Sequence, residues 1–306
     1  MSLIDADSLG LDATPSFATG GYSALYAFGD SLSDAGNIYT ETLHLVPSKP
    51  YYQGHFSNGI TWVENLALDL GLPALKPSLK GGTDFAYGDA ETGQDPLHKA
   101  TGIDLPSQLA KFEAKVKAPS PNALYTLSIG SNDVLDAVAA DATNPSGAQS
   151  DLMKAVANET SFVASLAAGG AKNFLIMDVP DLGLTPEETA QGSTVAQTAT
   201  QFAATYDTAL SASLADLAAQ DGLNLHILDA FTLIDQAVAD PAAYGFTNVM
   251  QPVWSGNYSN PKSGTLAVTG AAQNSYLFFD QLHPTEGGHL ALASAALQAL
   301  AAPALA

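Results

Sequence analysis

The chain has 306 residues, of which 46% are apolar and only 13% are charged. This composition is typical of a packed globular protein and excludes intrinsic disorder. The net charge is −21, and all ten basic residues are lysines. Such a surface repels nucleic-acid backbones and offers no guanidinium group for a phosphate or carboxylate, so nucleic acids and anionic substrates are disfavoured. The absence of cysteine also excludes disulfides and thiol catalysis.

The beginning of the chain differs from the rest. Residues 1–20 contain three aspartates but no basic residue and no apolar stretch, so this segment does not read as an intact secretion signal. No apolar run approaches the roughly 20 residues of a membrane-spanning helix, and we expect no stable insertion into a membrane. We therefore expect an N-terminal arm at residues 1–20, followed by a single domain at residues 21–306.

Short apolar runs alternate with longer helical patterns along most of the chain. Strands are predicted at residues 24–29, 122–129, 173–179 and 224–228, and helices at residues 61–70, 152–168, 194–220, 231–239 and 290–300. This alternation predicts a mainly parallel central sheet with helices on both faces and leaves the strand order open. The fold class that we expect is a flavodoxin-like three-layer α/β/α sandwich. The loops at residues 47–59 and 254–275 follow no clear period, and their aromatic side chains fit either a substrate pocket or ordinary packing.

A serine follows the first predicted strand almost directly, where residues 28–34 read F-G-D-S-L-S-D. The carboxyl ends of parallel strands form the crevice in which ligands bind, so Ser31 is a candidate nucleophile. The alternative is that Ser31 or Ser33 only caps the next helix, because serine is common at that position.

A base for this serine is predicted near the other end of the chain, where residues 279–284 read F-D-Q-L-H-P. Serine attack needs an imidazole to accept the hydroxyl proton, and the imidazole needs an acceptor that fixes its tautomer. His283 and Asp280 are three residues apart and can serve as base and orienting acid. The alternatives are an ordinary polar turn before a helix and a metal site formed by Asp280, His283, Glu286 and His289. The spacing of the two histidines does not place them on one helical face, so we expect neither a metal nor an organic cofactor.

Two further segments can stabilise the oxyanion of an acyl-transfer intermediate. Residues 130–133 read G-S-N-D after the strand predicted at residues 122–129, and Asn132 can donate a side-chain N–H to the oxyanion. Residues 81–90 read G-G-T-D-F-A-Y-G-D-A and can add a glycine amide, although a strand with turn glycines is the alternative.

Together these blocks resemble the GDSL lipases and esterases of the SGNH hydrolase superfamily. G-D-S-L at residues 29–32, G-S-N-D at residues 130–133 and D-Q-L-H at residues 280–283 match the family's blocks in the family's order. The resemblance implies the role of each site residue: Ser31 as nucleophile and backbone oxyanion donor, Asn132 as side-chain donor, His283 as base and Asp280 as its orienting partner.

Two stretches depart from the family pattern. The glycine block of the family reads N-F-A-x-G-G-A, whereas this chain has Asp84 and Asp89 in place of the asparagine and the second glycine. The resemblance then assigns the remaining oxyanion donor to Gly88. Residues 51–59 are similar to the Y-x-G-R-F-S-N-G stretch of secreted bacterial members, with His55 in place of arginine. The resemblance to these members implies an extracytoplasmic or secreted location.

The resemblance implies a serine carboxylic-ester hydrolase that acts on a small-molecule or lipid ester through an acyl-enzyme. The same triad can instead transfer the acyl group to an alcohol, and a non-catalytic acidic binding module with this fold is the alternative outside enzymes. The sequence contains no G-x-S-x-G, no G-x-x-x-x-G-K and no G-x-G-x-x-G. Their absence disfavours the nucleophile elbow of the α/β-hydrolases and a nucleotide-binding enzyme.

Overall fold

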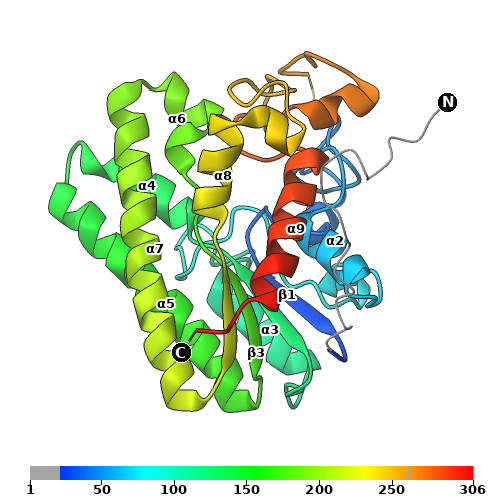
Figure 1. The fold of residues 1–306 in the computed structure, drawn as a ribbon, viewed down its shortest axis with the longest axis vertical. Coiled ribbons are helices and arrows are strands. Elements are labelled where there is room, and N and C mark those ends of the chain that lie inside the picture. The colour runs from blue at the N-terminus through cyan, green and yellow to red at the C-terminus, as the bar shows by residue number, and fades with distance from the viewer. Residues whose placement is uncertain (1–20, 259, 261, 306) are drawn as a thin grey trace.

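Four strands form the central sheet of the computed structural model (Figure 1). The structure describes residues 21–258, 260 and 262–305, so the arm expected at residues 1–20 lies outside the described residues. All pairings between the strands are parallel. The sheet has the order β1 (Leu25–Gly29), β2 (Leu124–Ser128), β3 (Asn173–Met177) and β4 (Asn224–Leu228).

A fifth segment runs along the outer side of β1 without becoming a regular strand. Ala27 donates its N–H to the carbonyl of Thr83 at 3.1 Å, and Phe85 donates its N–H to the carbonyl of Ala27 at 2.7 Å. With this segment included, the order across the sheet matches the flavodoxin-like arrangement, in which the second segment of the chain lies outside the first. The glycine block at residues 81–90 thereby lies next to the strand that leads to Ser31.

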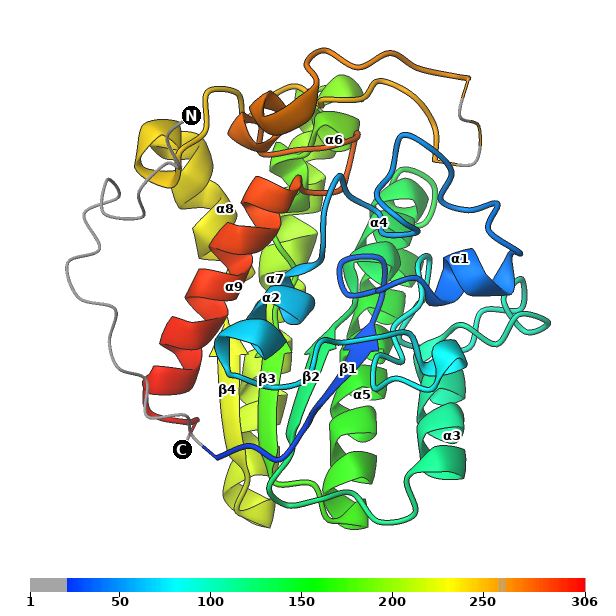
Figure 2. The same cartoon turned by 90° about the vertical axis from the view of Figure 1, so that its right-hand side faces the viewer.

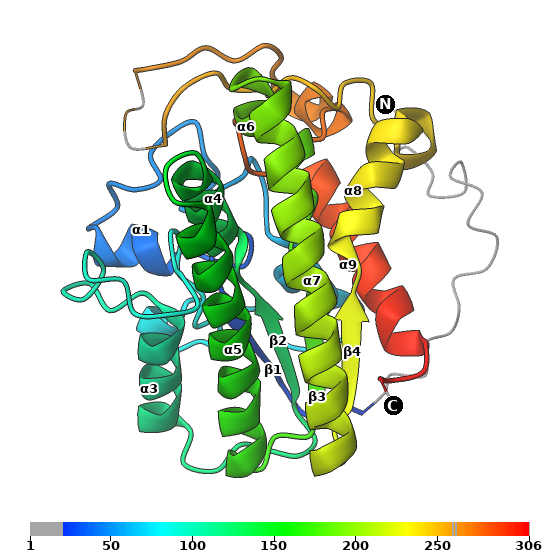
Figure 3. The same ribbon diagram turned by 90° about the vertical axis from the view of Figure 1, so that its left-hand side faces the viewer.

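Helices cover both faces of the sheet. Figure 3 shows α3 (Leu105–Lys115), α5 (Pro145–Gly169) and α7 (Ser193–Asp221) on one face, and Figure 2 shows α2 (Trp62–Asp69) and α9 (Glu286–Ala301) on the other. In addition, α8 (Ala230–Ala239) packs beside α9, and α4 (Ser131–Asp141) packs against α5 and α7. The predicted three-layer α/β/α fold is confirmed.

Strand residues alternate between two apolar cores because successive side chains of a strand point to opposite faces. Phe28 and Ile176 point to the core under α3, α5 and α7, whereas Ala27 and Met177 point to the core under α2 and α9. Aromatic rings fill much of the first core, where Phe28 stacks on Phe85 with the ring centroids 5.5 Å apart. Because both faces are buried, the strands read as continuous apolar runs in the sequence.

Several helices differ from the sequence prediction. Four are absent from it, namely α1 (Asn37–Glu41), α3, α4 and α6 (Pro186–Ala190). Two others begin earlier than predicted, because Asn144 and Thr285 cap α5 and α9 by accepting the backbone N–H groups of Gly147 and Gly288. Within the described part of the chain, no helix is both long enough and apolar enough to span a membrane.

Candidate active site

Ser31 lies in a turn directly after β1. The Asp30 amide continues the sheet by donating to the Ser128 carbonyl at 3.0 Å, and the Asp30 carboxylate accepts the Leu32 amide at 3.0 Å. Gly29 makes this turn possible, because its φ is +135° and a Cβ there would lie 1.9 Å from the Ser128 carbonyl oxygen. The half-buried Ser31 side chain is thereby held at the carboxyl edge of the sheet.

His283 approaches Ser31 from the other end of the chain. Its Nε2 lies 2.8 Å from Ser31 Oγ, and its Nδ1 lies 2.8 Å from Oδ2 and 3.0 Å from Oδ1 of Asp280. The Asp280 carboxylate also accepts the backbone N–H groups of Leu282 and His283 at 2.9 and 2.6 Å, which closes a tight turn. The three side chains form a continuous line of hydrogen-bonding atoms from a carboxylate through an imidazole to a hydroxyl.

Burial and the facing carboxylate have opposite effects on His283. Burial lowers the pKa of the imidazole, but the charge and the hydrogen bond of Asp280 outweigh it, and the net pKa lies above its ordinary value. Burial raises the pKa of Asp280, yet His283 and the hydroxyl of Tyr51 stabilise the carboxylate, and its net pKa lies below the ordinary value. An ionised carboxylate therefore faces an imidazole whose protonated form it stabilises.

Asn132 lies at the start of α4, just after β2, and lines the same pocket as Ser31. One N–H of its side-chain amide donates to the Ala90 carbonyl at 2.8 Å, which leaves the second N–H for another acceptor. The backbone N–H of Ser31 makes no hydrogen bond within the described part of the chain. Two residues that line this pocket therefore each carry an N–H group without a partner among the described residues.

Gly88 does not offer a third. Its only N–H donates to Oδ2 of the buried Asp34 at 2.9 Å, and Gly88 does not line the pocket beside Ser31. Packing requires a glycine here, because a Cβ would lie 2.3 Å from the ring of Phe56. The structure thus differs from the expectation that Gly88 supplies an oxyanion donor, since a carboxylate already binds its amide hydrogen.

Residues 51–58 support the turn between Asp280 and His283. Tyr51 Oη donates to Asp280 Oδ2 at 2.5 Å, and the ring centroid of Phe56 lies 5.2 Å from that of His283. Ser57 Oγ donates at 2.9 Å to the carbonyl of the residue after His283. The hydroxyls of Tyr51 and Ser57 reach partners 229 and 227 positions away. The sequence could not reveal such distant contacts, and it suggested for these aromatic residues only pocket lining or loop packing.

His55, in the loop before α2, pairs with a carboxylate. Its Nε2 lies 2.9 Å from Oε2 of the buried Glu64, and the same oxygen accepts the backbone N–H and the hydroxyl of Thr61. Burial lowers the pKa of His55, but Glu64 raises it, and the net pKa lies above the ordinary value. His55 therefore gives the Glu64 carboxylate a partner near the start of α2.

An apolar pocket opens beside Ser31 and His283. Its volume is about 580 Å³, including the part open to solvent. Most of the wall consists of aliphatic and aromatic side chains from β3, α8, α9 and the loops near them, namely Leu32, Met177, Pro180, Leu182, Ala230, Ile234, Phe278, Leu282, Pro284 and Leu292. A pocket of this size and lining suits an apolar ligand with a few polar contacts at one end.

The alternative metal site considered from the sequence involves residues that have other partners. His289 Nδ1 accepts the Trp62 amide at 3.2 Å, and burial lowers the pKa of His289 to about 3. Glu286 accepts a hydrogen bond from the side-chain amide of Asn274 at 2.8 Å. Asp280 and His283 bind each other, so each of the four residues already has a different contact.

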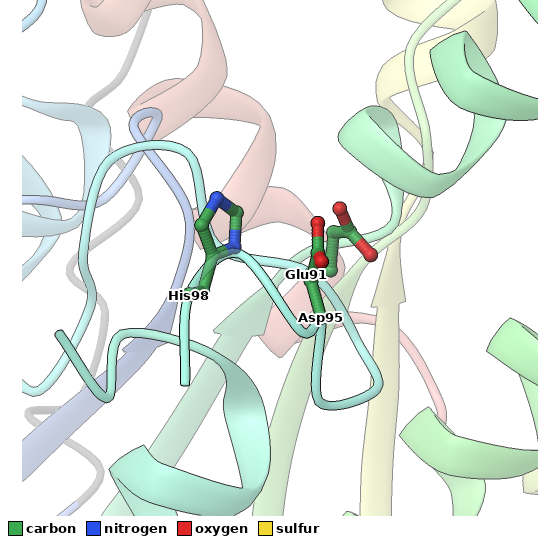
Figure 4. A group of neighbouring side chains, drawn as sticks. All are labelled: Glu91, Asp95 and His98. Carbon is green, nitrogen blue, oxygen red and sulfur yellow. The ribbon is translucent and has the colours of Figure 1, made fainter. Parts of the chain in front are cut away.

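A separate group of possible metal ligands lies in the loop before α3. Glu91, Asp95 and His98 place one ligand atom each within 4.8 Å of the others (Figure 4). Both ring nitrogens of His98 already face carboxylates, since Nδ1 lies 2.9 Å from Asp104 and Nε2 lies 3.4 Å from Asp89. None of the three residues lines the pocket beside Ser31, and we assign them no part in its chemistry.

Comparison with known families agrees with the order of the sequence blocks. A family model described as GDSL-like lipase/acylhydrolase matches residues 25–296. The chain belongs to this family. The resemblance drawn from the sequence is confirmed, and membership places the chain among esterases and lipases.

Individual relatives include both hydrolases and an acyltransferase. A phosphatidylcholine-sterol acyltransferase of Aeromonas hydrophila is 27% identical in an alignment that covers 93% of this chain and 90% of the relative. A GDSL esterase/lipase of Arabidopsis thaliana is 27% identical in an alignment that covers 86% of this chain and 82% of the relative. The solved acetylxylan esterase Axe2 of Geobacillus stearothermophilus is 16% identical, with coverage of 92% and 96% and a TM-score of 0.45.

Proposed function

We propose that this protein hydrolyses carboxylic esters through an acyl-enzyme, with Ser31 as nucleophile, His283 as general base and acid, and Asp280 as the group that orients His283. One observation supports the proposal most directly: His283 Nε2 lies 2.8 Å from Ser31 Oγ while Nδ1 faces the Asp280 carboxylate. A serine hydroxyl is a weak nucleophile unless a base accepts its proton, and this geometry supplies the base.

The first half of the reaction forms the acyl-enzyme. His283 Nε2 takes the hydroxyl proton as Ser31 Oγ bonds to the ester carbonyl carbon, and the electron pair of the carbonyl moves onto its oxygen. The Ser31 amide and the remaining N–H of Asn132 donate to this oxyanion. When the intermediate collapses, the bond to the alcohol oxygen breaks and that oxygen takes the proton from His283. Asp280 stabilises the imidazolium that exists between these two proton transfers.

The second half returns the enzyme to its starting state. Water gives a proton to His283 and attacks the acyl carbon through the same oxyanion site. Collapse breaks the bond to Ser31 Oγ, which takes back the proton, and the carboxylic acid leaves. Apart from the ester and water, these steps use only groups of this chain.

The pocket suggests the chemical class of the acyl group. The pocket wall is mostly aliphatic and aromatic. Ser31 and Asn132, between which the ester carbonyl would lie, also line the pocket. We propose that the pocket holds the hydrocarbon part of the acyl group of a small-molecule or lipid ester, because burial of methylene groups is favourable at about 0.8 kcal/mol each.

Acyl transfer to an alcohol is a second candidate, favoured by the relative that is named an acyltransferase. The two reactions share the acyl-enzyme and differ only in the acceptor that attacks it. Products formed from one ester with and without an added alcohol distinguish them. A new ester as the main product indicates a transferase, and free acid alone indicates a hydrolase.

Two further proposals concern the setting of the site. Ser31 and His283 come from opposite ends of the described chain, so we propose that residues 21–306 act as one catalytic unit. We also propose an extracytoplasmic location, which rests on the resemblance of residues 51–59 to secreted bacterial members. Fractionation of cells that express the gene, followed by an activity measurement in each fraction, tests the location.

The substitution Ser31→Ala tests the proposed function. We expect ester turnover to fall by roughly 10⁴-fold or more while the circular dichroism spectrum stays native, because removal of a triad nucleophile leaves only binding and oxyanion contacts. A fluorophosphonate probe should label the parent protein once per chain and Ser31→Ala not at all. Ser33→Ala is the matched control and should keep the label. Turnover near the parent rate in folded Ser31→Ala would exclude the mechanism, and a folded parent that takes no label would favour a binding module.

A further inference from the structure

The hydroxyl of Tyr51 reaches the carboxylate that faces His283. Tyr51 Oη donates to Asp280 Oδ2 at 2.5 Å, and the same oxygen lies 2.8 Å from His283 Nδ1. The other oxygen, Oδ1, accepts the backbone N–H groups of Leu282 and His283. Both carboxylate oxygens therefore accept hydrogen bonds from described residues. Among these donors, only Tyr51 comes from a distant segment.

The surroundings of Tyr51 hold its hydroxyl in place. The ring is buried among three other aromatic rings, with centroids 5.2 Å from Trp254, 5.1 Å from Phe279 and 6.3 Å from Phe56, each at a steep angle. Contacts on several sides of the ring keep the whole side chain from moving to another rotamer. The hydroxyl is thus aimed at Asp280 by packing and not by the hydrogen bond alone.

We infer that Tyr51 is a positioning residue for ester cleavage: its hydroxyl keeps the Asp280 carboxylate turned so that Oδ2 faces His283 Nδ1. This inference rests on the proposed function, since it concerns the residue that orients the general base. Tyr51 does not line the pocket and its hydroxyl bonds to Asp280, so we infer that it acts on the reaction through Asp280.

The hydrogen bond also has an electrostatic consequence. By donating to Oδ2, Tyr51 draws negative charge from the atom that faces the imidazole, and this weakens the attraction between Asp280 and a protonated His283. Without the hydroxyl, Asp280 becomes the stronger acceptor and the pKa of His283 rises. The other charges that act on His283, on Asp30 and Glu187, stay the same in such a variant.

Tyr51→Phe is the direct test, because it removes the hydroxyl and keeps the ring. We expect kcat to fall roughly tenfold with little change in KM, since a hydrogen bond to a charged group is lost away from the substrate. The acid limb of kcat/KM should move up by roughly half a pH unit. Tyr125→Phe is the matched control, because Tyr125 is also buried and its hydroxyl donates at 3.1 Å to the Ser120 carbonyl on another part of the sheet. It should leave kcat and the acid limb unchanged.

A double-mutant cycle shows whether Tyr51 acts through Asp280. In an Asp280→Asn background, the additional loss caused by Tyr51→Phe should shrink to less than about twofold, since the charged acceptor is gone. An undiminished loss in that background would overturn the inference, as would a Tyr51→Phe variant with the kcat and acid limb of the parent.

If Tyr51→Phe does not fold, 3-fluorotyrosine at position 51 is the substitute. Its more acidic hydroxyl should move the acid limb down, and an upward shift or no shift would contradict the inference.

The same experiment separates this inference from the proposed function. Ser31→Ala and Asp280→Asn are measured beside Tyr51→Phe. If Ser31→Ala remains active, the proposed function fails. If both variants lose activity while Tyr51→Phe behaves like Tyr125→Phe, only the role of Tyr51 fails.

Discussion

The titration of His283 determines the pH at which the proposed reaction can begin. The imidazole must be neutral to accept the Ser31 proton, and the net effect of burial and Asp280 is a pKa above the ordinary value near 6.5. We therefore expect kcat/KM to fall about tenfold for each pH unit below that pKa, with a midpoint above 6.5. A pH profile measured with a small uncharged ester checks the midpoint. A midpoint at or below 6.5 would contradict the expected rise in the pKa of His283.

Asp30 is the control for this profile because it also titrates in the same range. Burial raises the pKa of Asp30 to about 7, and its charge raises the pKa of His283. Asp30→Asn removes that charge, so the acid limb should remain and move to lower pH. Disappearance of the limb in this variant would assign it to Asp30 and not to His283.

From the sequence, candidate site residues could be predicted only where nearby residues in the chain, such as a predicted strand or a short motif, mark their position. Ser31 follows β1, Asn132 follows β2, and Asp280 lies three residues before His283, so order and spacing made them candidates, and the family resemblance supplied their roles. Tyr51 was missed because its partner lies 229 positions away and its own segment has no period. The other miss is the hydrogen bond that occupies the Gly88 amide, which depends on how a loop packs against a buried aspartate.

At the scale of elements, continuous apolar runs revealed the strands because both faces of the sheet are buried. Helix α4 was missed because it begins inside the G-S-N-D block, which reads as a loop when only its chemistry is considered. A signal for α3 was present, since Asp104 and Pro106 form the usual pattern of an N-cap followed by proline in the first turn. The irregular segment at residues 83–85 has no such signal. Its place is set by hydrogen bonds to the backbone of β1, and its own sequence has no strand periodicity.

Helix α8 forms one wall of the apolar pocket, and this gives a prediction about chain length. Ile234 is buried and lines the pocket. We expect Ile234→Ala to lengthen the pocket and to raise the ratio of kcat/KM for octanoyl over butanoyl esters roughly tenfold, because one methylene in an apolar pocket contributes about 1–3 kcal/mol. A panel of p-nitrophenyl esters from acetyl to dodecanoyl measures the ratio.

Leu233→Ala is the matched control on the same helix. Leu233 is half-buried and packs on the core under α2 and α9 without lining the pocket. It should lower stability without changing the order of preference among the esters. An equal change of preference in both variants would show that the helix as a whole, and not the pocket wall, controls acyl length.

At the scale of the whole molecule, acidic residues are buried as well as exposed. Burial raises the pKa of Glu159 to about 8, that of Asp178 to about 7 and that of Asp207 to about 9. Each of these groups binds its proton more tightly in the folded chain than in the unfolded chain, where carboxyl pKa values lie near 4. The stability that they contribute is therefore present at low pH and is lost as the pH rises through their folded pKa values. The net charge of −21 acts in the same direction, because repulsion grows as carboxyl groups ionise.

This linkage predicts that the protein unfolds more easily at pH 9 than at pH 6.5. Glu159→Gln tests the contribution of one of these buried carboxyl groups. Glu159 is fully buried, and its Oε2 accepts the Tyr206 hydroxyl at 2.5 Å, a bond that a glutamine oxygen can keep. His289 opposes this trend only weakly above pH 6.5, because burial lowers its folded pKa to about 3 and its unfolded pKa lies near 6.5. For the parent protein, the free energy of unfolding measured with urea should be lower at pH 9 than at pH 6.5. In Glu159→Gln the loss should be smaller by about 1–2 kcal/mol, because the group that ionises has been removed.

Glu113→Gln, at an exposed position on α3, is the control and should show the same decrease with pH as the parent. Equal slopes in all three proteins would show that Glu159 ionises in the folded chain as readily as in the unfolded chain.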